Sequence, residues 1–425
     1  MIKMDVVIEG KALLDSGLTS CCIGISDGRI AKIAKTISIA DRRYDLSNLL
    51  LLPAGIDLHV HFREPGMTHK EDFNTGSMSA VVGGTTFVMD MPNTLPATRS
   101  LSDLKEKIET ASGKCYADFG LAALLDSRTN AESLAGRATA LKMYVGETTG
   151  GLGVRQEEIS GLLGKAAAAK LPLMVHAEHT VPLPEIEETD LDGHDRHRSD
   201  GYEHMAAKAV CGNKPQEMRL HLLHVTTARV LKIARESGST AEITPHHLLL
   251  DKSMKLGTWG KVNPPLRSKS TRLKLWEALA SGLGDTVGSD HSPHTIAEKE
   301  EDFDAAPSGM PGAETRMPLM LQAVAERRLD IAQLSRYCCR RPAEIIGVPK
   351  GQLKEGFDAD IIAVDLRTGA KISADKLHSK CGWSAFDGMR AIFPRAVFLR
   401  GEKVSEAGEI VGERAGRYFG GGGSG

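Results

Sequence analysis

The sequence is poor in cysteine and has no long apolar segment, and both absences narrow the class of protein. Its seven cysteines are scattered along 425 residues without a Cys-x-x-Cys pair, which suits neither a disulfide framework nor a zinc knuckle and favours reduced thiols. No apolar run approaches the roughly 18 residues that span a bilayer, and the N-terminus lacks the basic start and apolar centre of a signal peptide. We therefore expect a soluble, cytoplasmic protein without a membrane partner.

An excess of charge of either sign is also absent. Lys and Arg total 53 against 55 Asp and Glu, which gives a formal net charge of −2. Without a basic field nothing indicates a nucleic-acid partner, and without an acidic excess nothing indicates disorder. The composition favours a small-molecule partner, and the chain is long enough for one large domain and a smaller one.

Both ends of the chain alternate apolar and polar residues in the manner of β-strands. Near the N-terminus this pattern covers residues 5–9, 22–26 and 29–33, and near the C-terminus residues 359–365 and 395–402. We expect residues 1–53 and 346–416 to build one composite β-sandwich domain together. The glycine-rich composition of residues 417–425 predicts a flexible tail.

Residues 54–345 show a repeated strand-then-helix rhythm, with amphipathic segments such as 157–170 and 228–236 between apolar runs. Parallel strands need long crossovers, so this rhythm favours a parallel sheet. Eight such units predict an α/β fold of the TIM-like (β/α)8 barrel type. The candidate strands cover residues 50–59, 86–91, 117–124, 139–145, 171–177, 219–225, 241–244 and 286–290.

Reactive side chains fall at the C-terminal ends of these candidate strands, the face where barrels of this type place their active sites. Residues i and i+2 of a strand point to the same face, so His59 and His61 can bind one ion. Side chains from the other strands would converge on the same point, which indicates a two-metal site. The candidates are His59, His61, Lys142, His176, His224 and Asp290.

Each candidate also has an ordinary structural interpretation. His176 and His224 could be core histidines satisfied by hydrogen bonds, and Asp290 could cap the following helix rather than bind metal and exchange a proton with water. Lys142 could find a carboxylate or reach water, since an unpaired buried ammonium is costly. Alternatively its neutral amine could react with carbon dioxide to give a carbamate that bridges two cations.

Several motifs together resemble dihydroorotases of the amidohydrolase superfamily over nearly the whole chain. They cover residues 57–66 (Asp-Leu-His-Val-His-Phe-Arg-Glu-Pro-Gly), 68–73, 83–86, 90–93, 289–294 and 356–361. The resemblance implies that the six candidates ligate two zinc ions bridged by carbamylated Lys142 and hydroxide. It also implies reversible cyclisation of N-carbamoyl-L-aspartate to L-dihydroorotate in pyrimidine synthesis, with Asp290 as general acid and base.

The resemblance further implies a set of substrate contacts. Arg63 is spaced to meet the substrate carboxylate, because a guanidinium offers a planar fork, although it could be an ordinary ion-pair arginine. Asn263 could instead be a turn residue beside Pro264, and the glycines of residues 308–312 could belong to a plain connector. The positions that match the family contacts are Arg63, Asn93, Asn263, His294, Pro311 and Gly312.

Other functions stay open at this point. An allantoinase or hydantoinase would share the metals and the carbamate, but allantoinases typically lack an arginine at position 63 and a hydantoin has no free carboxylate. A non-catalytic scaffold would keep the barrel without metals, although every ligand position here is filled. Leu223 stands where some relatives carry a cysteine for an additional metal, so we expect two ions. The sequence does not decide between a homodimer and an association with aspartate transcarbamoylase.

Overall fold

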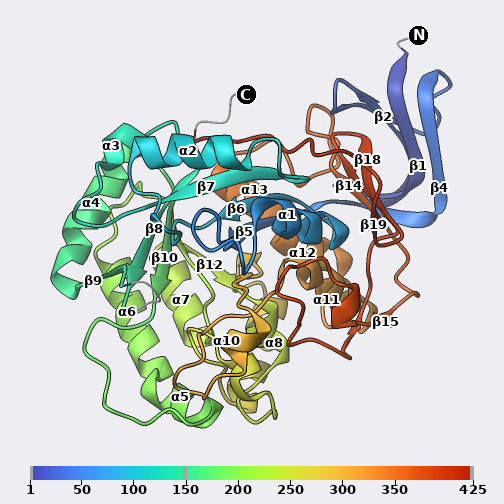
Figure 1. Ribbon diagram of the computed structural model, residues 1–425. Coiled ribbons are helices and arrows are strands. Elements are labelled where there is room, and N and C mark those ends of the chain that lie inside the picture. The colour runs from blue at the N-terminus through green and yellow to red at the C-terminus, as the bar shows by residue number, and fades with distance from the viewer. Residues whose placement is uncertain (1–2, 147–150, 422–425) are drawn as a thin grey trace.

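A computed structural model describes residues 3–146 and 151–421. Eight parallel strands form a barrel, and strands from both chain ends form a separate sheet beside it (Figure 1). The barrel strands are β5 (Gly55–Val60), β6 (Thr85–Asp90), β7 (Asp118–Leu124), β8 (Ala140–Val145), β10 (Leu173–Ala177), β11 (Leu220–Leu222), β12 (Thr240–Ile243) and β13 (Thr286–Val287). The terminal sheet contains β1 (Met4–Leu14), β2 (Gly17–Ser26), β3 (Arg29–Ala34), β4 (Ala40–Pro53), β14 (Ile361–Val364), β17 (Ala396–Leu399), β18 (Glu402–Glu406) and β19 (Glu409–Ile410).

The remaining elements surround the barrel. The α-helices are α1 (Phe73–Val82), α2 (Leu101–Ala111), α3 (Ala131–Leu134), α4 (Ile159–Ala169), α5 (Leu191–His197), α6 (Asp200–Gly212), α7 (Ala228–Glu236), α8 (Pro245–Leu249), α9 (Lys269–Ala280), α10 (Ile296–Lys299), α11 (Ala313–Ala325), α12 (Ile331–Ser335) and α13 (Arg341–Ile346). Short helical turns and strands are η1 (Gln156–Glu158), η2 (Gly257–Gly260), η3 (Arg336–Arg340), η4 (Ala374–Lys376), β9 (Gly153–Val154), β15 (Ala370–Lys371) and β16 (Arg390–Ala391). Across the described residues, no helix combines the length and the apolar character needed to cross a membrane.

The barrel closes between its first and last strands. The strand order runs from β13 through β12, β11, β10, β8, β7 and β6 to β5. Val60 and His291 then form a parallel bridge, in which the His61 amide donates to the His291 carbonyl at 2.8 Å. The predicted (β/α)8 barrel is therefore confirmed, and its closure lies directly beside two of the candidate metal ligands.

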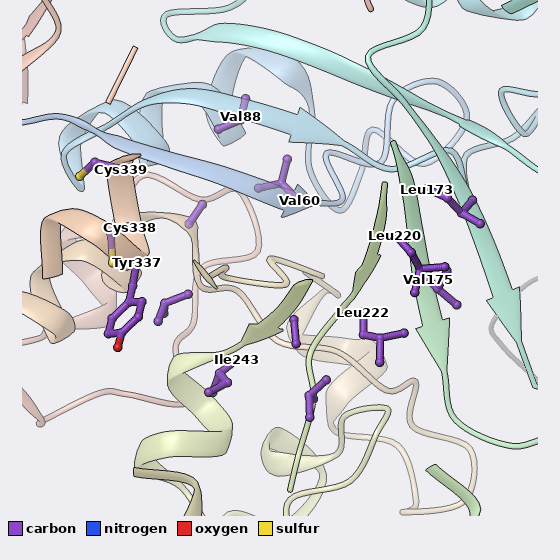
Figure 2. Close-up of a cluster of buried hydrophobic side chains, with 14 of the residues drawn as sticks. Val60, Val88, Leu173, Val175, Leu220, Leu222, Ile243, Tyr337, Cys338 and Cys339 are labelled. Carbon is purple, nitrogen blue, oxygen red and sulfur yellow. The ribbon is translucent and has the colours of Figure 1, made fainter. Parts of the chain in front are cut away.

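Alternation along the strands separates the packed core from the reactive side chains. On β10, Leu173 and Val175 are fully buried and pack with Leu220 and Leu222 of β11 (Figure 2). Met174 instead belongs to the cluster that fills the barrel interior. His176 lies two residues further along β10, so the strand period places it on the interior face above Met174. The same period places Lys142 above Ala140, which belongs to the same interior cluster.

One predicted strand proves to be two. The apolar run 50–59 was expected to form a single barrel strand, but Leu50 to Pro53 pair with β14 in the terminal sheet and β5 starts at Gly55. Both sheets need buried residues at this point, so the apolar pattern continues without a break across the junction. Two other predicted strands are shorter than expected, and His224 and Asp290 lie beyond the ends of β11 and β13.

The C-terminal region also departs from the expected boundaries. Residues 370–391 leave the terminal sheet and pack on the barrel loops, where the Trp383 indole donates to the His294 carbonyl at 2.7 Å. The composition predicts a flexible tail from residue 417, but the Phe119 amide donates to the Arg417 carbonyl at 2.9 Å, and the Phe419 amide donates back to Phe119 at 2.8 Å. That expectation is wrong for residues 417–421, because two aromatic side chains follow Arg417 and pack on the barrel; residues 422–425 lie outside the described residues.

Candidate metal and substrate site

Three ligand atoms converge where the barrel closes. Nε2 of His59 and Nε2 of His61 lie 3.3 Å apart, and Oδ1 of Asp290 is 3.3 Å from the first and 3.2 Å from the second. All three residues are buried. Burial lowers the pKa of both imidazoles well below the usual range, so they are neutral and can offer lone pairs to a cation. The three side chains therefore converge on one point, as the sequence predicts.

A second convergence lies at the ends of β10 and β11, which pair with each other. Nδ1 of His176 is 2.8 Å from Nε2 of His224, and Lys142 comes from β8 between them and the first group. These side chains line one cavity. Its lining comprises His59, His61, Arg63, Asn93, Lys142, Tyr144, His176, His224, Asn263, Asp290, Ser292, Ser308 and Gly309.

Two buried nitrogen atoms in this cavity have no hydrogen-bond partner among residues 3–146 and 151–421, namely Nζ of Lys142 and Nδ1 of His224. A polar atom that is buried and unpaired carries a free-energy cost, so such atoms need an explanation. Burial lowers the pKa of Lys142 to about 7, which gives the side chain a substantial neutral fraction near neutral pH. A donor set of four imidazoles, one carboxylate and one poorly paired amine fits divalent cations of the zinc type.

Other buried side chains hold these ligands in place. Oε1 of Glu242 lies 2.8 Å from Nδ1 of His59, and Oδ1 of Asn93 lies 2.6 Å from Nδ1 of His61. A hydrogen bond at the second ring nitrogen fixes the tautomer and leaves Nε2 free for a cation. His176 has its own carboxylate, because Oε2 of Glu178 lies 3.0 Å from its Nε2. Asn93 therefore contacts a candidate ligand as well as lining the cavity.

The backbone is strained at three site residues. Arg63, His224 and Asp290 have φ values of +62°, +37° and +48°, in the left-handed region that residues with a Cβ rarely adopt. Such conformations persist only where the surrounding structure enforces them, and they cluster at functional sites. Asp290 does not cap the next helix, since Thr295 caps α10 with its side chain. The capping alternative for Asp290 is thus wrong.

Arg63 is the main cation on the cavity wall. Its guanidinium is buried and donates to the Pro293 carbonyl at 3.1 Å and to Oγ of Ser292 at 2.7 Å. Nε2 of His294 lies 3.2 Å away. Within the described ranges no carboxylate comes within ion-pair distance of this guanidinium, so the ordinary ion-pair interpretation of Arg63 is not supported.

The other predicted substrate contacts do not all line the cavity that contains the metal ligands. Asn263 lines the cavity, and its Oδ1 is buried without a hydrogen-bond partner from the part of the chain that the structure describes. His294 stands behind Arg63 and also lies 3.2 Å from the Ser308 carbonyl. Pro311 and Gly312 line a separate small cavity beside His291. In the segment 308–312 it is Ser308 and Gly309 that line the main cavity.

Sequence reasoning did not single out Tyr144, Ser292 or Glu242 as site residues. Tyr144 lies two residues after Lys142, so the strand period places both on the same face, and Nζ of Lys142 is 4.5 Å from the centre of its ring. That spacing was the signal that could have identified it. Glu242 is the second-last residue of β12. Its contact is with His59, 183 residues away in the sequence, so no local pattern indicates it.

Comparison with known proteins finds relatives over almost the whole chain. The family described as the amidohydrolase family matches residues 50–402. The dihydroorotase of Methanosarcina acetivorans is 37% identical over 409 residues, which cover 89% of this chain and 87% of that protein. The dihydroorotase of Thermoplasma acidophilum is 37% identical and covers 93% of each chain. An L-hydantoinase (dihydropyrimidinase) from Arthrobacter aurescens superposes with a TM-score of 0.92 at 28% identity, covering 98% of this chain and 100% of that chain.

Proposed function

Because this chain belongs to the amidohydrolase family and is a cyclic amide hydrolase of the dihydroorotase group, we propose that it interconverts L-dihydroorotate and N-carbamoyl-L-aspartate in pyrimidine biosynthesis. The observation that carries this proposal is the buried Arg63 guanidinium, which faces the cavity without a carboxylate partner from the described part of the chain. A desolvated guanidinium attracts an anion. L-Dihydroorotate carries a carboxylate outside its cyclic amide, whereas hydantoin and dihydrouracil have none.

The donor set supports a pair of zinc ions. His59, His61 and Asp290 would hold one ion, His176 and His224 would hold the other, and Lys142 would reach both. When bound, two such ions supply Lewis acidity and a water of lowered pKa that can attack an amide carbonyl at neutral pH. The fit depends on neutral imidazoles and on unpaired ligand atoms, both of which the cavity provides.

Lys142 is the residue whose chemistry must change for this arrangement. Its amine is partly neutral near pH 7, so its nitrogen can form a bond to the carbon of carbon dioxide and release one proton. The resulting carbamate carries one negative charge and two oxygen atoms. This replaces an unpaired amine with an anion able to bridge two cations, which removes the unfavourable positive charge from the site.

The remaining residues divide the reaction between positioning and proton transfer. Arg63 would hold the exocyclic carboxylate, with His294 and Ser292 fixing the guanidinium from behind. Asn263 offers an unpaired amide oxygen to the ring. Asp290 would accept a proton as the nucleophile adds and deliver it to the ring nitrogen as the amide bond breaks. In the biosynthetic direction the same residue returns that proton, so one carboxyl group acts as both acid and base.

A hydantoinase or dihydropyrimidinase activity is the second candidate. It is favoured by the superposition on the Arthrobacter aurescens L-hydantoinase, whose fold is shared over nearly the full length of both chains. Both functions need the same ligands, so the metal cluster does not separate them. The buried cation of Arg63 does, because a neutral ring would leave it unpaired.

The test is a substrate panel run on one preparation whose zinc content is measured. L-Dihydroorotate, hydantoin, dihydrouracil and allantoin are supplied at equal concentrations near neutral pH, and ring opening is followed by ultraviolet absorbance. We expect turnover of dihydroorotate with about two zinc ions per chain. A preference for hydantoin or dihydrouracil would support the hydantoinase or dihydropyrimidinase activity instead. A chain that is inactive and contains no zinc would indicate a non-catalytic scaffold.

A further inference from the structure

Lys299 is a fully buried lysine at the end of α10, outside the cavity lining. Its Nζ donates to backbone carbonyls, at 2.9 Å to Pro307, 3.2 Å to Gly309 and 3.5 Å to Lys261. No carboxylate forms an ion pair with it in the part of the chain that the structure describes. Burying an ammonium is costly, so a lysine held in this way needs a reason beyond filling space.

The three carbonyls belong to two loops that both reach the cavity. Pro307 and Gly309 flank Ser308, and both Ser308 and Gly309 line the cavity. Lys261 stands two residues before the cavity-lining Asn263, and its carbonyl also accepts the Gly309 amide at 2.9 Å. A single lysine side chain therefore joins the wall formed by residues 307–309 to the wall formed by residues 261–263.

The carbonyls of Pro307 and Gly309 accept from Lys299, which stands outside the cavity lining. Nε2 of His294 lies 3.2 Å both from the Ser308 carbonyl and from a guanidinium nitrogen of Arg63, and as the acceptor for Arg63 it has no proton for that carbonyl. Carbonyl oxygens turned into the cavity would repel an anionic substrate, so holding them outward keeps the wall suited to a carboxylate.

We propose that Lys299 is a positioning residue that fixes the two substrate-facing loops relative to Arg63, and that it determines substrate binding rather than metal binding. The inference rests on the proposed function, since it assigns a role in binding the same anionic substrate. A lysine suits the task because its amine has two N–H donors when neutral and three when protonated, enough for the carbonyls of Pro307 and Gly309 in either state. An apolar side chain of similar length would leave these two carbonyls without this donor.

The kinetic test compares Lys299→Met with the wild-type enzyme on L-dihydroorotate. Loss of the donor to the carbonyls of Pro307 and Gly309 predicts a rise in KM of about tenfold or more, with kcat within about threefold and zinc content unchanged. Lys299→Gln keeps two N–H donors and should give an intermediate KM. If Lys299→Met does not fold, the Gln variant carries the same test, and a KM unchanged in the variant that folds overturns the proposal.

Lys214→Met is the matched control. It removes a half-buried lysine whose Nζ also donates to three backbone carbonyls, at 3.4 Å to Pro215 and at 3.2 Å to both Gln216 and Met218, and none of these residues lines the cavity. We expect a lower melting temperature for this control with KM within about threefold of wild type. Equal effects of both substitutions on KM would show that Lys299 only stabilises the fold in general, which contradicts the proposal.

Amide hydrogen exchange gives a readout that does not need turnover. In Lys299→Met, exchange should accelerate in segments 307–310 and 261–263 while strand β10 keeps its protection. If the wild-type enzyme fails to open dihydroorotate, the proposed function falls, and the exchange experiment still decides whether Lys299 joins the loops. Unchanged exchange in both segments would overturn the inference.

Discussion

Gly288 contacts the candidate metal site although it has no side chain. An added Cβ at this position would lie 2.0 Å from Oε2 and 2.4 Å from Cδ of Glu242, distances at which the carboxylate must move. That carboxylate contacts Nδ1 of His59 at 2.8 Å and accepts the His224 amide at 3.3 Å. Gly288→Ala should therefore disturb one ligand of each group without changing any ligand.

The size of the effect follows from what Glu242 does. Loss of a carboxylate that orients a ligating histidine typically lowers metal affinity by about 10- to 100-fold, equal to about 1.4 to 2.7 kcal/mol. The clash itself adds a cost in folding free energy of about 1 to 3 kcal/mol, as for other overpacked sites. The backbone of Gly288 is not in the left-handed region, so the substitution adds no conformational strain there.

Zinc affinity is measured by competition with a chromogenic chelator, and stability by thermal melting. Gly284→Ala is the matched control, because its Cβ would stand 3.0 Å from Cδ1 of Ile243 and leave Glu242 untouched. We expect a lower melting temperature for both variants and a loss of zinc affinity for Gly288→Ala alone. If Gly288→Ala binds zinc as tightly as the control, Glu242 does not orient the metal ligands and the reasoning is wrong.

Three other outcomes follow from the structure. Lys142→Ala should lose both zinc and activity, with partial recovery when a short carboxylic acid replaces the missing carbamate; full activity without the additive would exclude a bridging role. Glu314 raises the pKa of His378, so this pair stabilises the fold below the unfolded histidine pKa and the contribution is lost as pH rises through the folded pKa. The difference in melting temperature between wild type and His378→Ala should accordingly shrink from pH 6 to pH 9, and a constant difference would refute the pairing. Truncation after Gly416 should lower the melting temperature by a few degrees relative to truncation after Gly421, since it removes the Phe419 packing and its backbone hydrogen bonds; equal melting temperatures would show that these contacts contribute nothing.

Much of the architecture could be predicted from local pattern. Apolar runs of the right length located the barrel strands, and the strand period explains why Lys142 and His176 face the interior. The domain boundary was placed between residues 53 and 54, but the candidate strand 50–59 runs across it, because the strands on both sides of Ala54 are buried and the apolar pattern does not break there. The segment 370–391 has no clear period, so its return to the barrel through Trp383 depends on tertiary contacts alone.

The convergence of the candidate ligands could be predicted better than the contacts that support them. His59 and His61 stand two residues apart at the end of an apolar run, and Asp290 follows another such run, so the sequence displays these candidates. The contacts of Glu242 and Asn93 with the histidines join distant strands, and no local pattern encodes them. Sequence reasoning also placed Pro311 and Gly312 at the substrate, whereas the loop turns so that Ser308 and Gly309 line the main cavity.

The central claim is that Arg63 selects a carboxylate-bearing cyclic amide at this site. The most direct measurement is the ratio of kcat/KM for L-dihydroorotate to that for dihydrouracil, which has the same ring without the carboxylate, in the wild-type enzyme and in Arg63→Met. We predict a preference of at least about 100-fold in the wild type, as for a buried charge left unpaired by the wrong substrate, and its near loss in Arg63→Met with zinc content unchanged. A wild-type preference for dihydrouracil, or a preference for dihydroorotate that survives the substitution, would contradict the account.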